Sequence, residues 1–116
     1  MLKLRSIPYL LMAGIMVYQF LKQKTGVSLV TKTFRVSGNC ILCKNRIEDA
    51  LEVRGVNKAV WEEQTGMVSV TFNPKVISLD ALKALVAKAG HDTDTLKASD
   101  EAYAQLPASC QYERLG

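Results

Sequence analysis

Residues 34–51 read FRVSGNCILCKNRIEDAL, and this stretch decides the fold. A strand-like alternation of apolar and polar residues ends just before the cysteines, and a helical spacing of apolar residues begins beside them. The first turn of a helix has unpaired backbone N–H groups and the positive end of the helix dipole, which favour the thiolate form of a cysteine. Lys44 and Arg46 add positive charge nearby. The stretch therefore predicts that Cys40 and Cys43 form a bidentate thiol site at a strand-to-helix junction.

The loop in front of this pair suits a tight turn. Gly38 carries no Cβ, and Asn39 tolerates turn and cap conformations. The loop can therefore fold back over the two sulfur atoms. Two buried apolar cysteines, or a structural disulfide between them, remain the alternative interpretations of the pair.

The rest of the chain continues an alternation of strands and helices. Trp61 is expected to be a core aromatic, and Gly66 stands where a four-residue hairpin connection needs a positive φ. Ser78 is a good N-cap for the second helix, which we expect to end at Gly90. The expected elements are a strand over 28–36, a helix over 41–53, a hairpin of two strands around 58–62 and 67–73, a helix over 78–89 and a short strand over 93–96. The expected core of the sheet consists of Val30, Phe34, Val68, Val70 and Phe72.

Three segments of the sequence resemble a known family. They are VSGNCILCKNRIEDAL (36–51), GVNKAVWEEQTGMVSVTF (55–72) and SLDALKALVAKAGHD (78–92). Together they are similar to the heavy-metal-associated domain of copper chaperones, of the N-terminal modules of metal-pumping P-type ATPases and of periplasmic mercury-binding proteins. The resemblance implies an α+β fold, a ferredoxin-like βαββαβ sandwich over 27–97.

The resemblance also implies a function. In the family the two cysteines of the CxxC motif bind a soft metal ion, and they correspond to Cys40 and Cys43. Cu(I) or Hg(II) would suit two thiolates at a solvent-facing loop, whereas Zn(II) prefers four ligands. The expected partner is a metal-transporting membrane protein or another metal-binding domain, and no catalytic turnover is expected. The loop departs from the usual GMxC, because Gly38-Asn39-Cys40 is one residue shorter and lacks the methionine.

Two hypotheses from other classes stay open. A small thiol-disulfide oxidoreductase also places CxxC at a strand-to-helix junction. Such enzymes favour proline between the cysteines, where this chain has Ile41 and Leu42. A structural or regulatory module of a larger transport machine would also bind metal.

His91 and Cys110 are candidate auxiliary ligands. His91 follows the second helix, in a loop that the fold would bring beside the thiols, and it is either a third ligand or an exposed loop residue. Cys110 lies in a C-terminal tail over 98–116, which is expected to contain a short helix stopped by Pro107. Cys110 is a further ligand, a redox partner of the CxxC pair or an idle thiol.

The N-terminal segment, residues 1–26, is expected to be a membrane anchor or a signal segment. Its apolar run, residues 7–21, would span roughly 22 Å as a helix, against about 30 Å of hydrocarbon. Residues 1–35 carry six basic residues and no acidic one, while 36–116 carry 9 basic and 11 acidic residues. The basic balance therefore favours a membrane surface and gives no support for nucleic-acid binding.

The sequence also bears on whether the N-terminal segment is cleaved and on which side of the membrane the domain lies. No small-residue cleavage site follows the apolar run, so we expect an uncleaved anchor, with a cleaved signal or a core helix as the alternatives. The short basic start favours a domain on the periplasmic or extracytoplasmic side, whereas the lysines after the run favour the cytoplasm. We expect a membrane-associated protein whose domain lies on the periplasmic or extracytoplasmic side, with the cytoplasmic side as the alternative.

Overall fold

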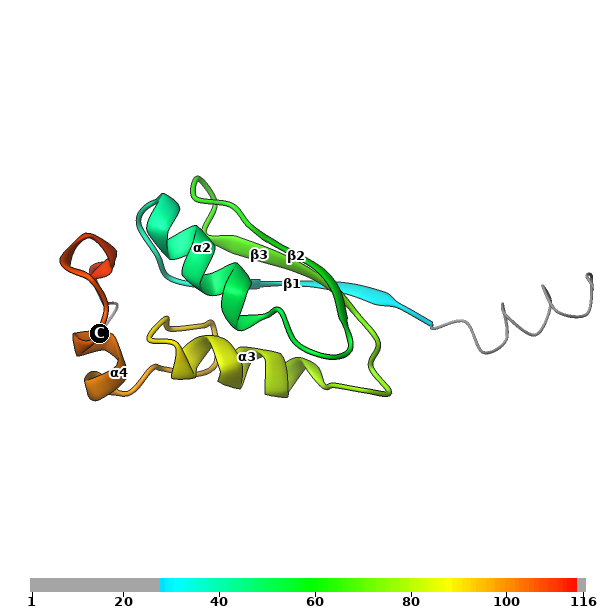
Figure 1. Ribbon diagram of the computed structural model, residues 1–116. Coiled ribbons are helices and arrows are strands. Elements are labelled where there is room, and N and C mark those ends of the chain that lie inside the picture. The colour runs from blue at the N-terminus through cyan, green and yellow to red at the C-terminus, as the bar shows by residue number, and fades with distance from the viewer. Residues whose placement is uncertain (1–27, 115–116) are drawn as a thin grey trace, which may run out of the picture.

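A three-stranded antiparallel sheet carries two helices on one face in the computed structural model, which describes residues 28–114 (Figure 1). The strand order in the sheet is β1-β3-β2. The elements are β1 (Val30–Arg35), α2 (Ile41–Ala50), β2 (Val56–Trp61), β3 (Met67–Phe72), α3 (Leu79–Lys88), α4 (Asp100–Ala104) and the 3-10 helix η1 (Ala108–Cys110). The α+β, ferredoxin-like class expected from the sequence is confirmed.

The central strand β3 pairs with both of its neighbours. Its register with β1 runs from Val30↔Phe72 to Arg35↔Met67. Alternate residues of a strand point to one face, so the inward face of the sheet is apolar. Of the expected core, Phe34, Val68, Val70 and Phe72 are buried, and Val30 packs against them half-buried.

Helix α2 buries one side against the sheet. Cys43, Ile47 and Leu51 are fully buried, at spacings that place them on one helical face. The helix ends at Ala50, three residues before the predicted end at Val53. The chain turns there because it must reach the start of β2 within a few residues.

Helix α3 begins and ends as the sequence predicts. The Ser78 hydroxyl accepts a hydrogen bond from the backbone N–H of Ala81 at 3.1 Å, which caps the helix. Leu82 and Val86 are fully buried. Gly90, which follows the helix, has a φ of 107°, a conformation that favours glycine.

The hairpin also agrees with the sequence. Trp61 is buried, and its indole Nε1–H donates to the Val36 carbonyl at 2.9 Å. This bond satisfies the one polar group of the ring. Gly66 has a φ of 72° in the connection between β2 and β3.

The predicted fourth strand, residues 93–96, is wrong. The structure keeps only an isolated antiparallel bridge between Val36 and Thr93. The Thr93 hydroxyl accepts from the backbone N–H of Leu96 at 2.9 Å, and the Thr93 N–H donates to the Leu96 carbonyl at 2.7 Å. These local bonds fold the segment into a turn, which competes with pairing along β1.

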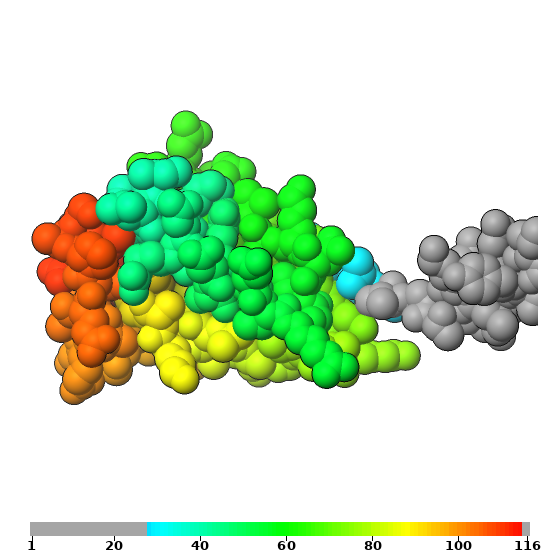
Figure 2. All heavy atoms as spheres, viewed as in Figure 1, coloured from blue at the N-terminus to red at the C-terminus, as the bar shows by residue number. Residues whose placement is uncertain are grey.

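The tail folds back onto one end of the domain. Figure 1 shows α4 and η1 beside the start of α2 and the end of α3, at the end of the molecule opposite the first described residues. In Figure 2 the orange and red atoms of this tail form one continuous surface with those of α2. Ser99 caps α4 by accepting from the Ala102 N–H at 3.1 Å. The predicted short helix before Pro107 is thus present.

The N-terminal segment falls outside the described residues. The expected anchor over 1–26, with its apolar run 7–21, therefore stays a prediction. Within residues 28–114, no helix has both the length and the apolar character that crossing a membrane requires.

Candidate metal site

Two cysteine side chains meet at the start of α2. Cys40 occupies the N-cap position in an extended conformation, and Cys43 lies in the first turn. Their Sγ atoms are 3.9 Å apart. Cys40 is partly exposed and Cys43 is fully buried, so one thiol faces the loop and the other faces the core. One metal ion can therefore touch both sulfurs and still be approached from outside.

The approach of the loop to this pair depends on Gly38. A Cβ at this position would lie 3.0 Å from the Cβ of Cys43 and 3.0 Å from the indole ring of Trp61. Gly38 does not have a positive φ, so a glycine is needed here for close packing and not for its backbone conformation. The neighbouring Asn39 accepts a hydrogen bond from the Cys43 thiol at 3.1 Å, a contact that the sequence did not reveal.

The two thiols have different acidities. Hydrogen bonding to the backbone N–H of Cys43, in the first turn of α2, lowers the pKa of Cys40 although burial opposes this effect. Burial raises the pKa of Cys43 to about 11, against the hydrogen-bonding contribution of Asn39. The exposed sulfur is thus the readier thiolate.

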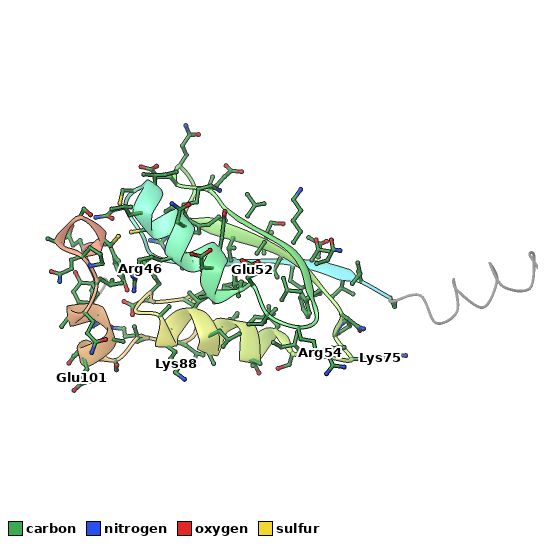
Figure 3. The ribbon with its side chains drawn as sticks, viewed as in Figure 1. Arg46, Glu52, Arg54, Lys75, Lys88 and Glu101 are labelled. Carbon is green, nitrogen blue, oxygen red and sulfur yellow. The ribbon has the colours of Figure 1, made fainter. Side chains whose placement is uncertain are left out.

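The positive charges beside the motif are engaged elsewhere. Lys44 Nζ lies 2.5 Å from a Glu48 carboxylate oxygen and donates to the Trp61 carbonyl at 2.9 Å. Arg46 reaches across from α2 to the Ala89 carbonyl at 3.4 Å, at the end of α3 (Figure 3). The helix terminus accounts for the lowered pKa of Cys40, and these two side chains do not point their charges at its sulfur.

The tail brings a third thiol to the pair. The Sγ atoms of Cys40, Cys43 and Cys110 all lie within 4.8 Å of one another, and no disulfide joins them. Figure 3 shows yellow sulfur atoms between the start of α2 and the tail. The Ser109 carbonyl is 3.4 Å from the Sγ of Cys40, and the Cys110 carbonyl is 3.8 Å from the Sγ of Cys43. The position of Cys110 could not be read from its place about 67 residues further along the chain.

His91 is buried, so the exposed-loop interpretation is wrong. Its Nδ1 is 2.9 Å from the Ser37 carbonyl and its ring stacks on Tyr112 with centroids 5.6 Å apart. Its Nε2 is buried without a hydrogen-bond partner. Burial lowers the pKa of His91, opposed by the Ser37 carbonyl and assisted by the positive charge of Arg46. The structure does not group His91 with the three sulfurs; the histidine instead contacts Ser37, in the loop that precedes Cys40.

A polar network that the sequence did not reveal fixes the tail. The Tyr112 hydroxyl donates to the Gly90 carbonyl and accepts from the Asp92 N–H, both at 2.8 Å. Burial raises the pKa of Tyr112 to about 12. Arg114 binds both carboxylate oxygens of Asp92, at 2.9 and 3.1 Å. Burial would raise the pKa of Asp92, but these bonds and the Ala98 N–H hold it below its usual range.

Similar proteins are found among ATPases and small metal-binding proteins. A copper-exporting P-type ATPase of Staphylococcus saprophyticus is 32% identical over 79 residues, which are 65% of this chain and 10% of the ATPase. This chain thus spans about a tenth of the length of that relative.

Among solved structures, oxidized MerP from Ralstonia metallidurans CH34 superimposes with a TM-score of 0.55 at 29% identity, over 58% of this chain and 96% of MerP. The CopZ metallochaperone gives a TM-score of 0.53 at 27% identity, over 55% of this chain and 98% of CopZ. The profile of the heavy-metal-associated domain matches residues 33–92, just over half of the 116 residues. The chain belongs to the heavy-metal-associated domain family.

Proposed function

We propose that this protein binds one soft metal ion, Cu(I) or Hg(II), through Cys40 and Cys43 and hands it to a partner in metal transport or detoxification. The observation that carries the proposal is the 3.9 Å separation of the two sulfurs at the N-terminal end of α2. The thiolate is the form that binds metals, and the N-terminal turn of α2 favours this form for Cys40. Family membership supports the same conclusion.

The donor set favours a soft ion of low coordination number. Thiolates select Cu(I) and similar soft ions over hard ones such as Mg(II) or Ca(II). Zn(II) in structural sites takes four ligands, and residues 28–114 bring no carboxylate or histidine into the group formed by Cys40, Cys43 and Cys110. The relatives include a copper-exporting ATPase and a metallochaperone, which favours copper.

A partner that takes the ion has an apolar surface to contact. Ile41 and Leu42, between the two cysteines, are 61% and 47% exposed. A metal-transporting membrane protein, or a second metal-binding domain, would cover these side chains while its own thiols enter the site. Partner docking over apolar side chains next to the metal would exclude water during the exchange.

A transfer assay tests hand-over directly. The full-length chain in detergent, loaded with Cu(I), is mixed with a separate heavy-metal-associated domain, and copper is measured in each protein after chromatographic separation. We expect the ion to distribute between the two proteins, and Ile41→Ser with Leu42→Ser to slow the exchange without changing Cu(I) affinity. Copper that stays entirely with the loaded chain, despite a partner of higher affinity, would contradict hand-over.

We also propose that residues 1–26 hold the protein at a membrane, with the domain on the extracytoplasmic side. The support is the apolar run 7–21 with lysines or arginines on both sides. Cell fractionation with an alkaline carbonate wash tests the attachment. We expect the full-length chain in the membrane pellet. A full-length chain in the soluble fraction would contradict an anchor, and a shortened soluble chain would indicate a cleaved signal.

A thiol-disulfide oxidoreductase is the alternative that uses the same cysteines. The family found for residues 33–92 does not favour it. We therefore expect no catalytic turnover in an insulin-reduction assay with the full-length chain and dithiothreitol. A rate close to that of thioredoxin would reverse this ranking.

A further inference from the structure

Cys110 is a buried thiol that the two-cysteine site leaves unused. Its sulfur lies within 4.8 Å of both other sulfurs, and its side chain has no exposed surface. We infer that Cys110 is a third sulfur ligand, so that the ion is held by three thiolates and covered by the tail. This inference rests on the proposed function and adds to it the coordination number and a closed state of the site.

The distance between the Cys40 and Cys43 sulfurs is closer to that of a three-coordinate ion than to that of a linear two-coordinate ion. With a metal–sulfur bond of about 2.3 Å, three sulfurs in a plane around one ion lie about 4.0 Å apart, whereas two sulfurs on opposite sides lie about 4.6 Å apart. The sulfurs of Cys40 and Cys43 are 3.9 Å apart. This distance matches the three-coordinate arrangement and leaves one position around the ion toward Cys110.

The tail is built to hold its cysteine in place. Leu106, Cys110 and Tyr112 are part of the same buried cluster as the sheet and helices. A Cβ on Gly90 would lie 2.9 Å from the Ala102 carbonyl and 3.0 Å from the Leu106 side chain, so the absence of a side chain there lets α4 and the following turn pack closely. Ordering these residues costs backbone conformational entropy, a cost that burial and hydrogen bonds of the tail must offset.

Two sets of polar contacts hold the chain that follows Cys110 against the domain. Tyr112 is 4% exposed, and its hydroxyl bridges Gly90 and Asp92 in the loop after α3. Arg114 donates from Nε and Nη2 to the two carboxylate oxygens of Asp92. This bidentate geometry fixes the orientation of the pair and also strengthens it. The sulfur of Cys110 is therefore held from both sides along the chain, by Leu106 before it and by these contacts after it.

A three-sulfur site changes how the ion leaves. An incoming thiolate of the partner forms a bond to the metal while the bond to Cys110 breaks, and Cys110 takes up the proton that the partner's thiol gives up. No electron is transferred, and the metal keeps its charge. Cys40 and Cys43 hold the ion throughout, so the tail acts as a cover that the partner displaces.

X-ray absorption spectroscopy on the metal tests the inference. The full-length chain in detergent is loaded with Cu(I) or with Hg(II), without added thiols, and compared with Cys110→Ala and with the control Glu113→Gln, a change of an exposed side chain in the same tail. We expect three sulfur neighbours in the natural chain and in the control, and two with a shorter metal–sulfur bond in Cys110→Ala. We also expect Cys110→Ala to bind the metal at least about tenfold more weakly in chelator competition.

The outcomes separate this inference from the proposed function. Two sulfurs in the natural chain would overturn the third ligand while leaving the binding by Cys40 and Cys43 intact, and so would an unchanged affinity in Cys110→Ala. The sulfur count of the natural chain decides even if Cys110→Ala folds poorly. A double variant of Cys40 and Cys43 to Ser with undiminished affinity would instead contradict the proposed function itself.

Discussion

At the scale of single residues, the two cysteines of one motif have opposite environments. Cys40 is partly exposed at the N-cap with a lowered pKa, while burial raises the pKa of Cys43 to about 11. The exposed thiolate suits capture of an incoming ion or attack by a partner's ligand. The buried sulfur, held by Asn39 and packed on the core, suits retention.

The contact between Gly38 and the core predicts a strict requirement for glycine. Gly38→Ala would place a Cβ 3.0 Å from both Cys43 and Trp61, so we expect a loss of about 1–3 kcal/mol in the free energy of unfolding. Urea denaturation measures it. The exposed Thr33→Ala serves as the control, with an expected change within about 0.5 kcal/mol. Equal stability of Gly38→Ala and the natural chain would show that the loop is looser than described.

His91 predicts a dependence of stability on pH. Burial lowers its pKa in the folded state, so the unfolded chain binds the proton first as the pH falls. The free energy of unfolding should therefore decrease once the pH drops below about 6.5, the usual value for histidine. His91→Gln, whose amide can still donate to the Ser37 carbonyl, should reduce this decrease. Identical pH profiles for the two proteins would contradict a buried neutral His91.

At the scale of elements, the sequence predicts most of the scaffold from local signals. Ser78 and Ser99 mark the starts of their helices because each hydroxyl accepts from the backbone N–H three residues further along the chain. Val68, Val70 and Phe72 occupy every second position, and this spacing predicts β3. The predicted fourth strand does not form because Thr93 hydrogen-bonds to the backbone N–H and carbonyl of Leu96. The alternation of residue types does not show whether these backbone groups pair within the segment or with another strand.

The ion pair between Asp92 and Arg114, which links the domain to the tail, is expected to be sensitive to acid. The pKa of Asp92 is held below its usual range, so its pairing with Arg114 stabilises the fold at neutral pH and is lost as the pH falls below about 3.9, through the lowered pKa. We expect Asp92→Asn to lose about 1–3 kcal/mol of unfolding free energy at pH 7, and this difference to vanish in strong acid.

A matched control exists in the same network. Asp100 also pairs with Arg114 at 2.9 Å, but its side chain is 97% exposed. An exposed ion pair contributes about 0–1 kcal/mol, so Asp100→Asn should change stability little. Equal effects of the two substitutions, measured by urea denaturation, would contradict the special role of the buried carboxylate.

At the scale of the whole molecule, the domain and its tail form one buried cluster that ends at the thiol site. The closeness of the Cys40 and Cys43 sulfurs could be predicted from the sequence because both residues lie in one local motif. The placement of Cys110 and the burial of His91 could not, since they depend on contacts such as Tyr112 with Gly90 and Asp92. Contacts between a tail and residues far away in the chain leave no local pattern in the sequence from which they could be predicted.

The most direct measurement is a chelator competition titration of the full-length chain in detergent with Cu(I), Hg(II) and Zn(II). Cys40 and Cys43 are the two thiols of one local motif, so they should dominate affinity for the soft ions. We expect one Cu(I) or one Hg(II) per chain, weaker Zn(II), and loss of tight binding when Cys40 and Cys43 are both replaced by Ser while circular dichroism shows the fold retained. Undiminished Cu(I) and Hg(II) affinity in that folded double variant would contradict the account.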